Sequence, residues 1–234
     1  MDILYASYNL EKNKNNIIEL IKPSLNNYGL IKAFGPSIYK ARIPEELLSK
    51  LNNFIDATIN DEEESKKLDV GKGLVGDVKQ EFKLDKKTVQ ESGWLKFLGD
   101  TVAQWIYKDT GNKISEFRLI ESWVVRQFEN EYNPIHWHSG HISGAGFLKL
   151  PETFGKPYQD NKPDYRGGNL ELIHGNRMFL SQCRYPIKPK VGDFYFFPHY
   201  LMHTVYPFNS TNEERRSVSF NALIDEKTFN VYAN

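Results

Sequence analysis

The feature that most constrains the fold is a change in the spacing of apolar residues near residue 117, from a helical spacing to that of strands. From there to residue 224 the chain is a series of short β-branched or aromatic segments separated by turn residues. Segments of this kind predict the strands of an antiparallel sheet. In order they are FRLIESWVVRQF, GAGFLKLP, GNLELIHG, FYFFP, HTVYPF and RRSVSFNALI. So many short strands predict a β-sandwich or barrel, for which a jelly-roll is the usual solution.

Two helices are predicted before these strands. Residues 43–59 repeat leucine and isoleucine at helical spacing, with Pro44 where a first helical turn tolerates it. Residues 92–111 form the second helix, with Ser92 as the expected N-cap and Gly111 as its end. Its buried stripe is expected to comprise Trp94, Leu95, Leu98, Val102 and Trp105 or Ile106.

The other N-terminal segments carry weaker patterns. Residues 1–40 are interpreted as edge strands and loops, and residues 60–91 are charged and punctuated by Gly71, Gly73 and Gly76. The motif GKGLVG at 71–76 lacks the Lys-Ser/Thr ending and the preceding buried strand of a phosphate-binding loop, so we interpret it as a solvated loop or lid. We find no internal repeat and no linker.

Composition narrows the class of protein. The 30 basic residues balance the 30 acidic ones, so no global field favours nucleic acid or an anionic membrane. The single Cys183 excludes an intramolecular disulfide framework and a cysteine-rich zinc site. No run approaches the roughly 18 apolar residues of a membrane span, and no signal peptide is visible. We expect a soluble cytoplasmic protein without membrane or nucleic-acid partners.

Two closely spaced histidines suggest a metal site. In NPIHWHSGHISG, residues 133–144, His136 and His138 are one residue apart. Side chains alternate on an extended strand, so both imidazoles leave one face while Trp137 leaves the other. That geometry suits two ligands of one metal ion, whereas the alternative is a pair of exposed loop histidines. His141 is a further candidate ligand or substrate contact, with a plain loop position as its alternative.

A third candidate ligand is His203, at the start of the segment HTVYPF. Its separation from His138 is too long for a zinc finger and normal for ligands on neighbouring strands of a jelly-roll. Imidazole ligands suit iron, zinc, copper or nickel. His199 follows a proline in a predicted loop and is expected to be structural or solvent-facing. His174, at a His-Gly turn, is expected to be solvated.

The last predicted strand has one polar face. Strand alternation places Arg216 on the apolar face and puts a polar row on the other, namely Arg215, Ser217, Ser219 and Asn221. Arg215 and Ser217 would offer a bidentate fork and a hydroxyl to a carboxylate. This face predicts one wall of a polar pocket, and the alternative is a solvated face.

These motifs, in this order, resemble the iron(II)- and 2-oxoglutarate-dependent dioxygenases. The resemblance is closest to a bacterial and phage branch related to prolyl hydroxylases, which carries NPPHxHxxSxxSGVYYLKxP. The matching text here is NPIHWHSGHISGAGFLKLP, followed by RGGNLELIHG, GDFYFFPHYLMHTVYPF and ERRSVSFN. The match covers about residues 120–225, and its ordered motifs make it specific.

The resemblance implies an α+β, mainly β fold within a single domain, 1–234. A double-stranded β-helix (jelly-roll) catalytic core would occupy residues 119–226, flanked by helices and strands of residues 1–118. The core would hold Fe(II) through three histidines, namely His136, His138 and His203. It would also bind 2-oxoglutarate, whose far carboxylate would pair with Arg215 and Ser217.

Two further residues gain an interpretation from the resemblance. Arg166 lies in a loop that borders the metal in this family, so we expect it on the substrate side. Glu171 lies on a strand near the metal, but nothing makes it a ligand.

The sequence departs from the family's common pattern in three places. His138 stands where the family usually has the carboxylate of a two-histidine, one-carboxylate triad. Gly146 and Phe147 stand where the branch usually has two tyrosines. His138-Ser139-Gly140 can also be read as the His-x-Gly of related halogenases, in which the carboxylate position is open for halide. We expect the three-histidine site, because the register of the branch pairs His136 with His138.

Two functions from different classes follow. The first is an Fe(II)/2-oxoglutarate oxygenase that hydroxylates a peptidyl residue or a small metabolite and releases succinate and CO2. The alternative is a cupin-like three-histidine metal protein, either a 2-oxoglutarate-independent dioxygenase or a non-catalytic metal-binding module. Arg215 and Ser217 discriminate between them, because a three-histidine site without a keto acid needs no carboxylate clamp. The sequence predicts neither the substrate nor the oligomeric state.

Overall fold

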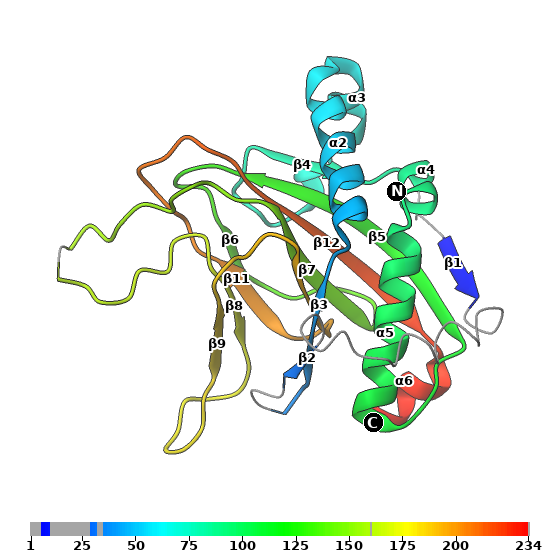
Figure 1. Cartoon of the computed structure of the whole chain (residues 1–234). Coiled ribbons are helices and arrows are strands. Elements are labelled where there is room, and N and C mark those ends of the chain that lie inside the picture. Colours follow the sequence, from blue (N-terminus) through cyan, green and yellow to red (C-terminus); the bar gives the residue numbers. More distant parts are fainter. Residues whose placement is uncertain (1–5, 10–28, 32–34, 160, 234) are drawn as a thin grey trace.

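The computed structural model describes residues 6–9, 29–31, 35–159 and 161–233. The fold is mainly β, with two antiparallel sheets and a few helices (Figure 1). This confirms the coarse prediction of a mainly β chain with flanking helices.

The larger sheet has eight strands in the order β1-β5-β12-β7-β10-β3-β2, and β4 pairs with β5 beside β1. The long strands β5, β12 and β7 form its centre, and their ladders are antiparallel. The strands of this sheet are β1 (Ala6–Asn9), β2 (Gly29–Ile31), β3 (Ile38–Arg42), β4 (Gln80–Lys83), β5 (Glu116–Gln127), β7 (Ile142–Lys149), β10 (Asp193–Pro198) and β12 (Arg215–Ile224).

The smaller sheet has four strands in the order β6-β11-β8-β9. Its strands are β6 (Asn133–His136), β8 (Leu170–Ile173), β9 (Arg184–Ile187) and β11 (Met202–Val205). The helices lie against the larger sheet (Figure 1). They are α2 (Glu45–Asn60), α3 (Glu62–Leu68), the 3-10 turn η2 (Gly71–Gly73), α4 (Lys86–Glu91), α5 (Trp94–Thr110) and α6 (Glu226–Ala233).

Two buried apolar clusters hold the helices against the larger sheet and the two sheets against each other. One lies between helices α2 and α5 and the outer face of the larger sheet, and it includes Trp94, Phe194, Phe196 and Phe220. The other lies between the sheets and joins β8, β10 and β11. Strand β10 serves both, because its side chains alternate: Phe194 and Phe196 face the helices, whereas Tyr195 and Phe197 face the other sheet.

The two predicted helices are present as α2 and α5. All residues of the expected stripe on α5 are buried, including both Trp105 and Ile106. The predicted N-cap was wrong by one residue, since the capping position is Gly93 at φ +94°. Ser92 still contributes, because its hydroxyl accepts a hydrogen bond from the Trp94 amide. Gly111 ends the helix with a left-handed conformation, as predicted.

The motif at residues 71–76, interpreted as a solvated loop or lid, consists of the 3-10 turn η2 and a following loop that lines the cavity described below. The rest of residues 60–91, where no helix or strand was predicted, contains α3, β4 and α4. Strand β4 extends the larger sheet by pairing Gln80–Lys83 with β5. The expectation of edge strands within residues 1–40 holds for β1 and β2, but β3 lies between β10 and β2. The rest of that prediction falls outside the described residues.

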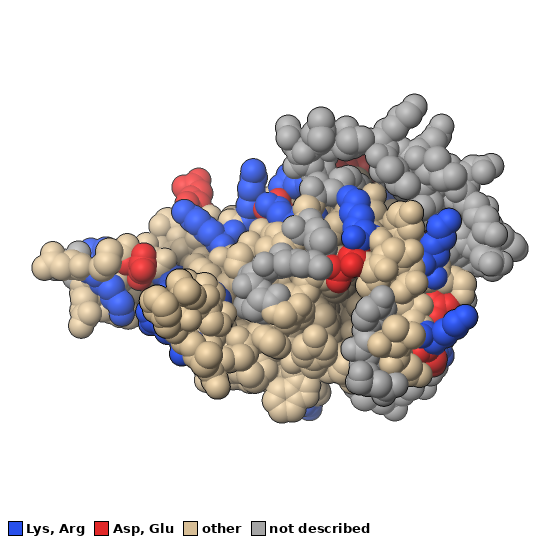
Figure 2. All heavy atoms as spheres, turned by 90° about the horizontal axis from the view of Figure 1, so that it is seen from below, with Lys and Arg blue, Asp and Glu red and all other residues tan. Residues whose placement is uncertain are grey.

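The surface charge of the structure agrees with the equal numbers of basic and acidic residues in the sequence. Basic and acidic side chains lie interspersed on the face drawn in Figure 2. Within the described residues, no helix has both the length and the apolar character needed to cross a bilayer.

One buried ionic network ties the helical layer to the larger sheet. Arg216, on β12, is buried and binds Glu214 through two nitrogens at 2.7 and 3.0 Å. The same guanidinium donates to Asp56 Oδ1 at 2.7 Å and to Asn52 Oδ1 at 3.0 Å, both on α2. Hydrogen bonds from Arg216 and Arg126 lower the pKa of Glu214 against the desolvation of its carboxyl.

We predict that Arg216→Ala lowers the free energy of unfolding by about 3–5 kcal/mol, because it leaves the buried Glu214 carboxylate without its main partner. Asp56→Ala should cost only about 0–1 kcal/mol, because the Asp56 side chain is 59% exposed. Equilibrium urea unfolding of the two variants measures this difference. Equal losses would contradict the assignment of Glu214 as the main partner of Arg216.

Candidate metal centre and adjoining cavity

Strand pairing brings two of the predicted histidines together. His136 ends β6, and His203 lies on the neighbouring strand β11 as its direct cross-strand partner. Opposed side chains in an antiparallel pair approach closely, and here the ring centroids are 4.2 Å apart. His203 is almost completely buried, with 4% exposure, and it also contacts Phe197 at 5.0 Å between ring centroids.

His138 joins this pair from beyond the end of β6. Its Nε2 lies 3.1 Å from His203 Nε2, and its ring centroid is 5.0 Å from that of His136. The backbone stays in place through a hydrogen bond from the His138 amide to His199 O. Trp137, between the two histidines, is 65% exposed, although it also lines the cavity described below. The expected convergence of His136 and His138 is therefore present, whereas Trp137 is not excluded from their side.

Hydrogen bonds and burial fix the chemical state of these imidazoles. His136 Nδ1 donates to Pro134 O at 2.7 Å, and His203 Nδ1 donates to Leu201 O at 2.9 Å. The Nε2 atoms of both rings therefore keep their lone pairs. Desolvation lowers the pKa of all three histidines, and that of His138 to about 3. All three are neutral at pH 7, as metal ligation requires.

The donor set fits a transition metal ion. One nitrogen from each ring lies within 4.8 Å of the others. Two nitrogens that bind one ion at about 2.1 Å are roughly 3 Å apart, which matches the 3.1 Å between His138 and His203. Backbone carbonyls that accept the second ring nitrogen, as at His136 and His203, are the usual support of a ligating histidine.

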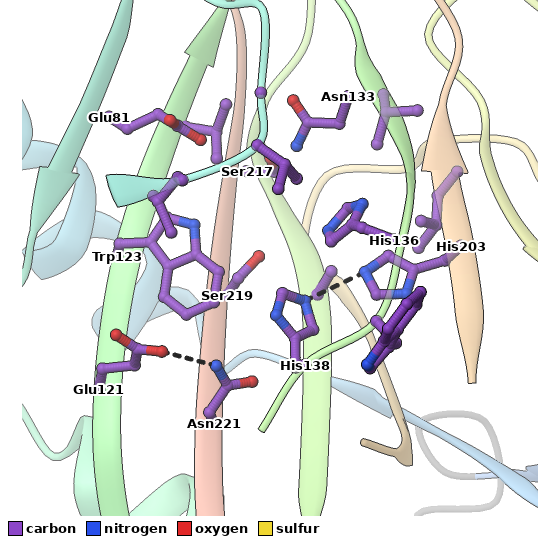
Figure 3. Close-up of a pocket in the computed structure, with 18 of the residues that line it drawn as sticks. Glu81, Glu121, Trp123, Asn133, His136, His138, His203, Ser217, Ser219 and Asn221 are labelled. Atoms are coloured by element: carbon purple, nitrogen blue, oxygen red, sulfur yellow. Dashed lines mark hydrogen bonds between the residues drawn. The ribbon is translucent and has the colours of Figure 1, made fainter. Parts of the chain in front are cut away.

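The three histidines line one wall of a cavity of about 200 Å³ between the two sheets (Figure 3). The opposite wall comes from β4, β5 and β12 of the larger sheet. The residues lining the cavity are Gly73, Leu74, Val75, Gly76, Glu81, Glu121, Trp123, Val125, Asn133, His136, Trp137, His138, Ser139, Ala145, Leu170, His203, Val205, Arg215, Ser217, Ser219 and Asn221.

Arg215 and Ser217 face this cavity and Arg216 faces the helices, as strand alternation predicted. Arg215 is 2% exposed, and its Nε donates to Gly168 O at 3.0 Å. Its Nη1 donates to Ser217 Oγ at 3.1 Å, and its guanidinium lies 5.1 Å from the centre of the Phe147 ring.

The charge of Arg215 has no protein counterion among the described residues, where no acid forms an ion pair with it. Desolvation lowers the pKa of Arg215 to about 9, so the side chain stays cationic at pH 7. Burying a charge without a partner is costly. The neighbouring Arg216 is equally buried but has two carboxylate partners. Arg215 therefore has the environment of a site for an anionic ligand.

Other histidines lie outside the cluster. His141 is buried and stacks on Phe229 of α6 at 3.7 Å, so it holds the C-terminal helix and is not a ligand. Its Nδ1 accepts the Ile224 amide. His199 bonds through its ring to His138 O, which is the structural position expected for it. His174 is half-buried, not solvated as predicted.

Arg166 and Glu171 do not line the cavity. Glu171 is buried and pairs with Arg166 at 2.8 Å and with Arg184. These ion pairs stabilise the pairing of β8 with β9. The expectation that Arg166 contacts substrate therefore lacks support in this geometry, whereas Glu171 is outside the histidine cluster, as expected.

The departures from the family's pattern have local physical reasons. A side chain at Gly146 would overlap the Phe194 ring, because β7 packs closely under the helix-facing core. Phe147 is fully buried and forms the platform beneath Arg215. Gly140 has φ +94°, and a Cβ there would lie 2.9 Å from Ala222 O, so its backbone requires glycine.

Several lining residues were missed by the sequence interpretation. Glu121, Trp123 and Val125 alternate along β5, and that alternation was a usable signal once the strand had been assigned. The loop 73–76 belongs to the motif interpreted as a solvated loop or lid, and Glu81 lies in the charged segment after it. No sequence signal assigned either of them to the cavity.

The comparisons with known proteins agree with this geometry. Residues 121–221 match a family model described as "Putative 2OG-Fe(II) oxygenase". This segment runs from β5 to β12 and contains all three clustered histidines, Arg215 and Ser217. No curated protein sequence matches the chain.

Solved structures share the fold at low sequence identity. A prolyl-4-hydroxylase from Pseudomonas putida has a TM-score of 0.52 and 15% identity, covering 79% of this chain and 91% of its own. The α-ketoglutarate-dependent epimerase SnoN of nogalamycin biosynthesis has a TM-score of 0.51 and 14% identity, covering 79% and 77%. AviO1 from Streptomyces viridochromogenes has a TM-score of 0.50 and 12% identity, covering 78% and 87%.

These structural likenesses establish the fold, and the family match places an oxygenase signature on the strands that carry the cavity. The cofactors that this family implies are Fe(II) and 2-oxoglutarate. Residues 121–221 thus resemble the 2OG-Fe(II) oxygenases, and the chain shares the fold of the solved structures named above.

Proposed function

We propose that this protein is an Fe(II)- and 2-oxoglutarate-dependent hydroxylase that acts on a small molecule or a peptide and releases succinate and CO2. His136, His138 and His203 would hold the iron. Arg215 and Ser217 would bind the distal carboxylate of 2-oxoglutarate. The proposal includes a double-stranded β-helix core at residues 119–226 within a single domain.

One observation carries the proposal: a neutral three-histidine cluster and an unpaired buried arginine line the same cavity. 2-Oxoglutarate has a keto acid at one end and a carboxylate at the other. A ligand of that shape would satisfy both features at once, since its keto acid suits a metal and its far carboxylate suits a guanidinium fork.

Fe(II) and 2-oxoglutarate, when bound, supply the oxidising chemistry of the family, in which decarboxylation of the keto acid is coupled to oxidation of a substrate C–H bond. The chain's own residues bind, orient and exclude water. Ser217 accepts from Arg215 and leaves its own hydroxyl hydrogen for the ligand. Trp123 and Phe197 contact the histidine rings and keep water from that side of the cluster.

The alternative of a three-histidine protein without 2-oxoglutarate leaves Arg215 unexplained. Such a site would need no cation at the end of the cavity, and a buried guanidinium without a counterion destabilises the fold. We therefore prefer the hydroxylase.

We predict that the purified protein binds Fe(II) at one equivalent and that single alanine substitutions at His136, His138 or His203 abolish this stoichiometric binding. Metal analysis of anaerobically loaded protein measures it. His199→Ala is the matched control, because its ring contacts only a backbone oxygen of the cluster. Full iron content in His203→Ala would refute the site.

The identity of the third ligand has a separate test. We predict that His138→Asp retains iron, because an aspartate restores the common triad with a similar reach. Uncoupled 2-oxoglutarate turnover should proceed without added halide in the wild-type protein. Under the halogenase interpretation, His138→Asp would lose iron, His136→Ala would keep it, and turnover would depend on chloride.

Arg215 gives a third prediction. Arg215→Ala should raise the dissociation constant for 2-oxoglutarate well over tenfold, since truncating one partner of a buried charge pair costs about 2–5 kcal/mol. Calorimetric titration of iron-loaded protein measures the constant. Arg216→Ala should bind 2-oxoglutarate normally at temperatures where it is folded, and the exposed Arg177→Ala controls for charge alone. Loss of affinity in Arg216→Ala but not in Arg215→Ala would contradict the assignment.

A further inference from the structure

The part of the cavity wall that β4 and β5 form contains two acids that the proposed binding of iron and 2-oxoglutarate does not use. Glu81 on β4, and Trp123 and Glu121 on β5, line it, with the indole between the two carboxylates (Figure 3). The pairing register explains this row. Glu81 lies opposite Val125, and the pocket-facing positions of β5 then continue through Trp123 to Glu121.

Glu81 is the unusual member of this wall. It is 1% exposed, and its Oε2 finds no hydrogen-bond donor among the described residues. The loop 73–76 packs directly on this carboxyl, since a Cβ at Gly76 would lie 3.1 Å from Glu81 Oε1. Within the described structure, this loop donates no hydrogen bond to the Glu81 carboxyl. A buried acceptor left unsatisfied in this way is rare and costly.

Without a cation nearby, the surroundings of Glu81 make its carboxyl harder to ionise. Desolvation, and then the like charge of Asp69, raise the pKa of Glu81 to about 7. Asp69 lies outside the cavity lining, where it accepts the Gly71 amide. A cationic ligand beside Glu81 would stabilise the carboxylate and supply the missing donor.

Glu121 and Trp123 complete a cation-binding surface. Glu121 accepts a hydrogen bond from Asn221 Nδ2 at 2.7 Å, which fixes the position of its carboxylate. Trp123 is 5% exposed and presents its ring to the cavity between the two acids (Figure 3). A cation over an indole face is attracted by the ring quadrupole, and more strongly in a desolvated site.

The distribution of charge points the same way. Among the described lining residues Arg215 is the one cation, and it lies on β12, the strand that pairs with β5. With the three imidazoles neutral, a divalent metal ion is balanced by the two carboxylates of 2-oxoglutarate. Arg215 then balances one of the two glutamates. Ionised Glu81 and Glu121 together leave one negative charge in excess, which a singly cationic substrate would neutralise.

We propose that the substrate of this site carries a cationic nitrogen, an ammonium or guanidinium group, which Glu81, Trp123 and Glu121 bind on the β4–β5 wall of the cavity. This inference rests on the proposed function for the identity of the site as an oxygenase centre. The shared chemistry fits two sources, a free basic amino acid or a basic residue within a peptide.

The test is a binding measurement on the Fe(II)- and 2-oxoglutarate-loaded protein without oxygen. Calorimetric titrations compare two matched probe pairs, L-arginine with L-citrulline and L-lysine with L-norleucine. Each pair is used free and with its α-amino and carboxyl groups capped as acetyl and amide. We expect the cationic member to bind at least about tenfold more tightly than its neutral partner. Preference only among the capped probes indicates a peptide source, and preference only among the free probes indicates a metabolite.

Glu81→Gln, which keeps the shape of the side chain, should reduce that preference to less than about threefold. Glu62→Gln, at an exposed carboxylate of α3, should leave it intact. Equal binding of cationic and neutral probes to the wild-type protein would overturn the proposal whether or not the variant folds. Preference that survives in Glu81→Gln would overturn the role of Glu81.

Failure of the proposed function has a different signature. In that case 2-oxoglutarate does not bind to the iron-loaded protein before any probe is added. The same probe titrations without 2-oxoglutarate would then still decide whether the wall selects a cation.

Discussion

Strand β12 pairs with β5 on one side and with β7 on the other, and the pleat of this one strand separates the core from the cavity. Its odd-numbered residues from 215 to 221 line the cavity, whereas Val218 and Phe220 belong to the apolar core under the helices. A slip of one residue in either ladder would exchange the two faces. The position of Arg215 in the cavity therefore depends on the same register that buries Phe220.

The two adjacent arginines illustrate how this constraint is used. Both are almost fully buried. Arg216 is bound by Glu214 and Asp56, whereas the hydrogen bonds of the Arg215 side chain within the described residues go to a carbonyl and a hydroxyl. Arg216 stabilises the attachment of α2 to the sheet. Arg215 keeps an unsatisfied charge whose cost the rest of the fold offsets. Such a cost is common at sites that await a ligand, because the bound state recovers it.

Sequence reasoning succeeded where the alternation of side chains along a strand determines which way a residue faces. The alternation of RRSVSFNALI assigned Arg215 and Ser217 to one face, since a central strand with two different faces permits only one register. The spacing of His136 and His138 predicted a shared face for the same reason. The meeting of these residues with His203 needed the pairing of β6 with β11, which no local pattern specifies.

The same reasoning failed where tertiary contacts decide the structure. Helix α3 is highly charged and is held by the Asp61 cap and by pairs such as Glu62–Lys66. Strand β4 is four residues long and exists because β5 offers it an edge. The burial of Glu81 follows from that docking alone. A charged residue in a glycine-rich segment gives no local sign that it will face a cavity.

The proposed third ligand, His138, has a consequence for the whole cavity. Three neutral imidazoles leave the charge of a divalent ion uncompensated by its own ligands, so the compensating anions must come from the co-substrate or from farther away. Arg215 lies at the end of the cavity that would take the co-substrate's distal carboxylate. The acids among the lining residues, Glu81 and Glu121, both lie on the β4–β5 wall, away from the histidines. Arg215 and the two acids lie on neighbouring strands of the larger sheet, whereas the clustered histidines include residues of the smaller sheet. The proposed cationic end of a substrate would be held on the larger sheet, and its uncharged portion could then extend toward the histidines.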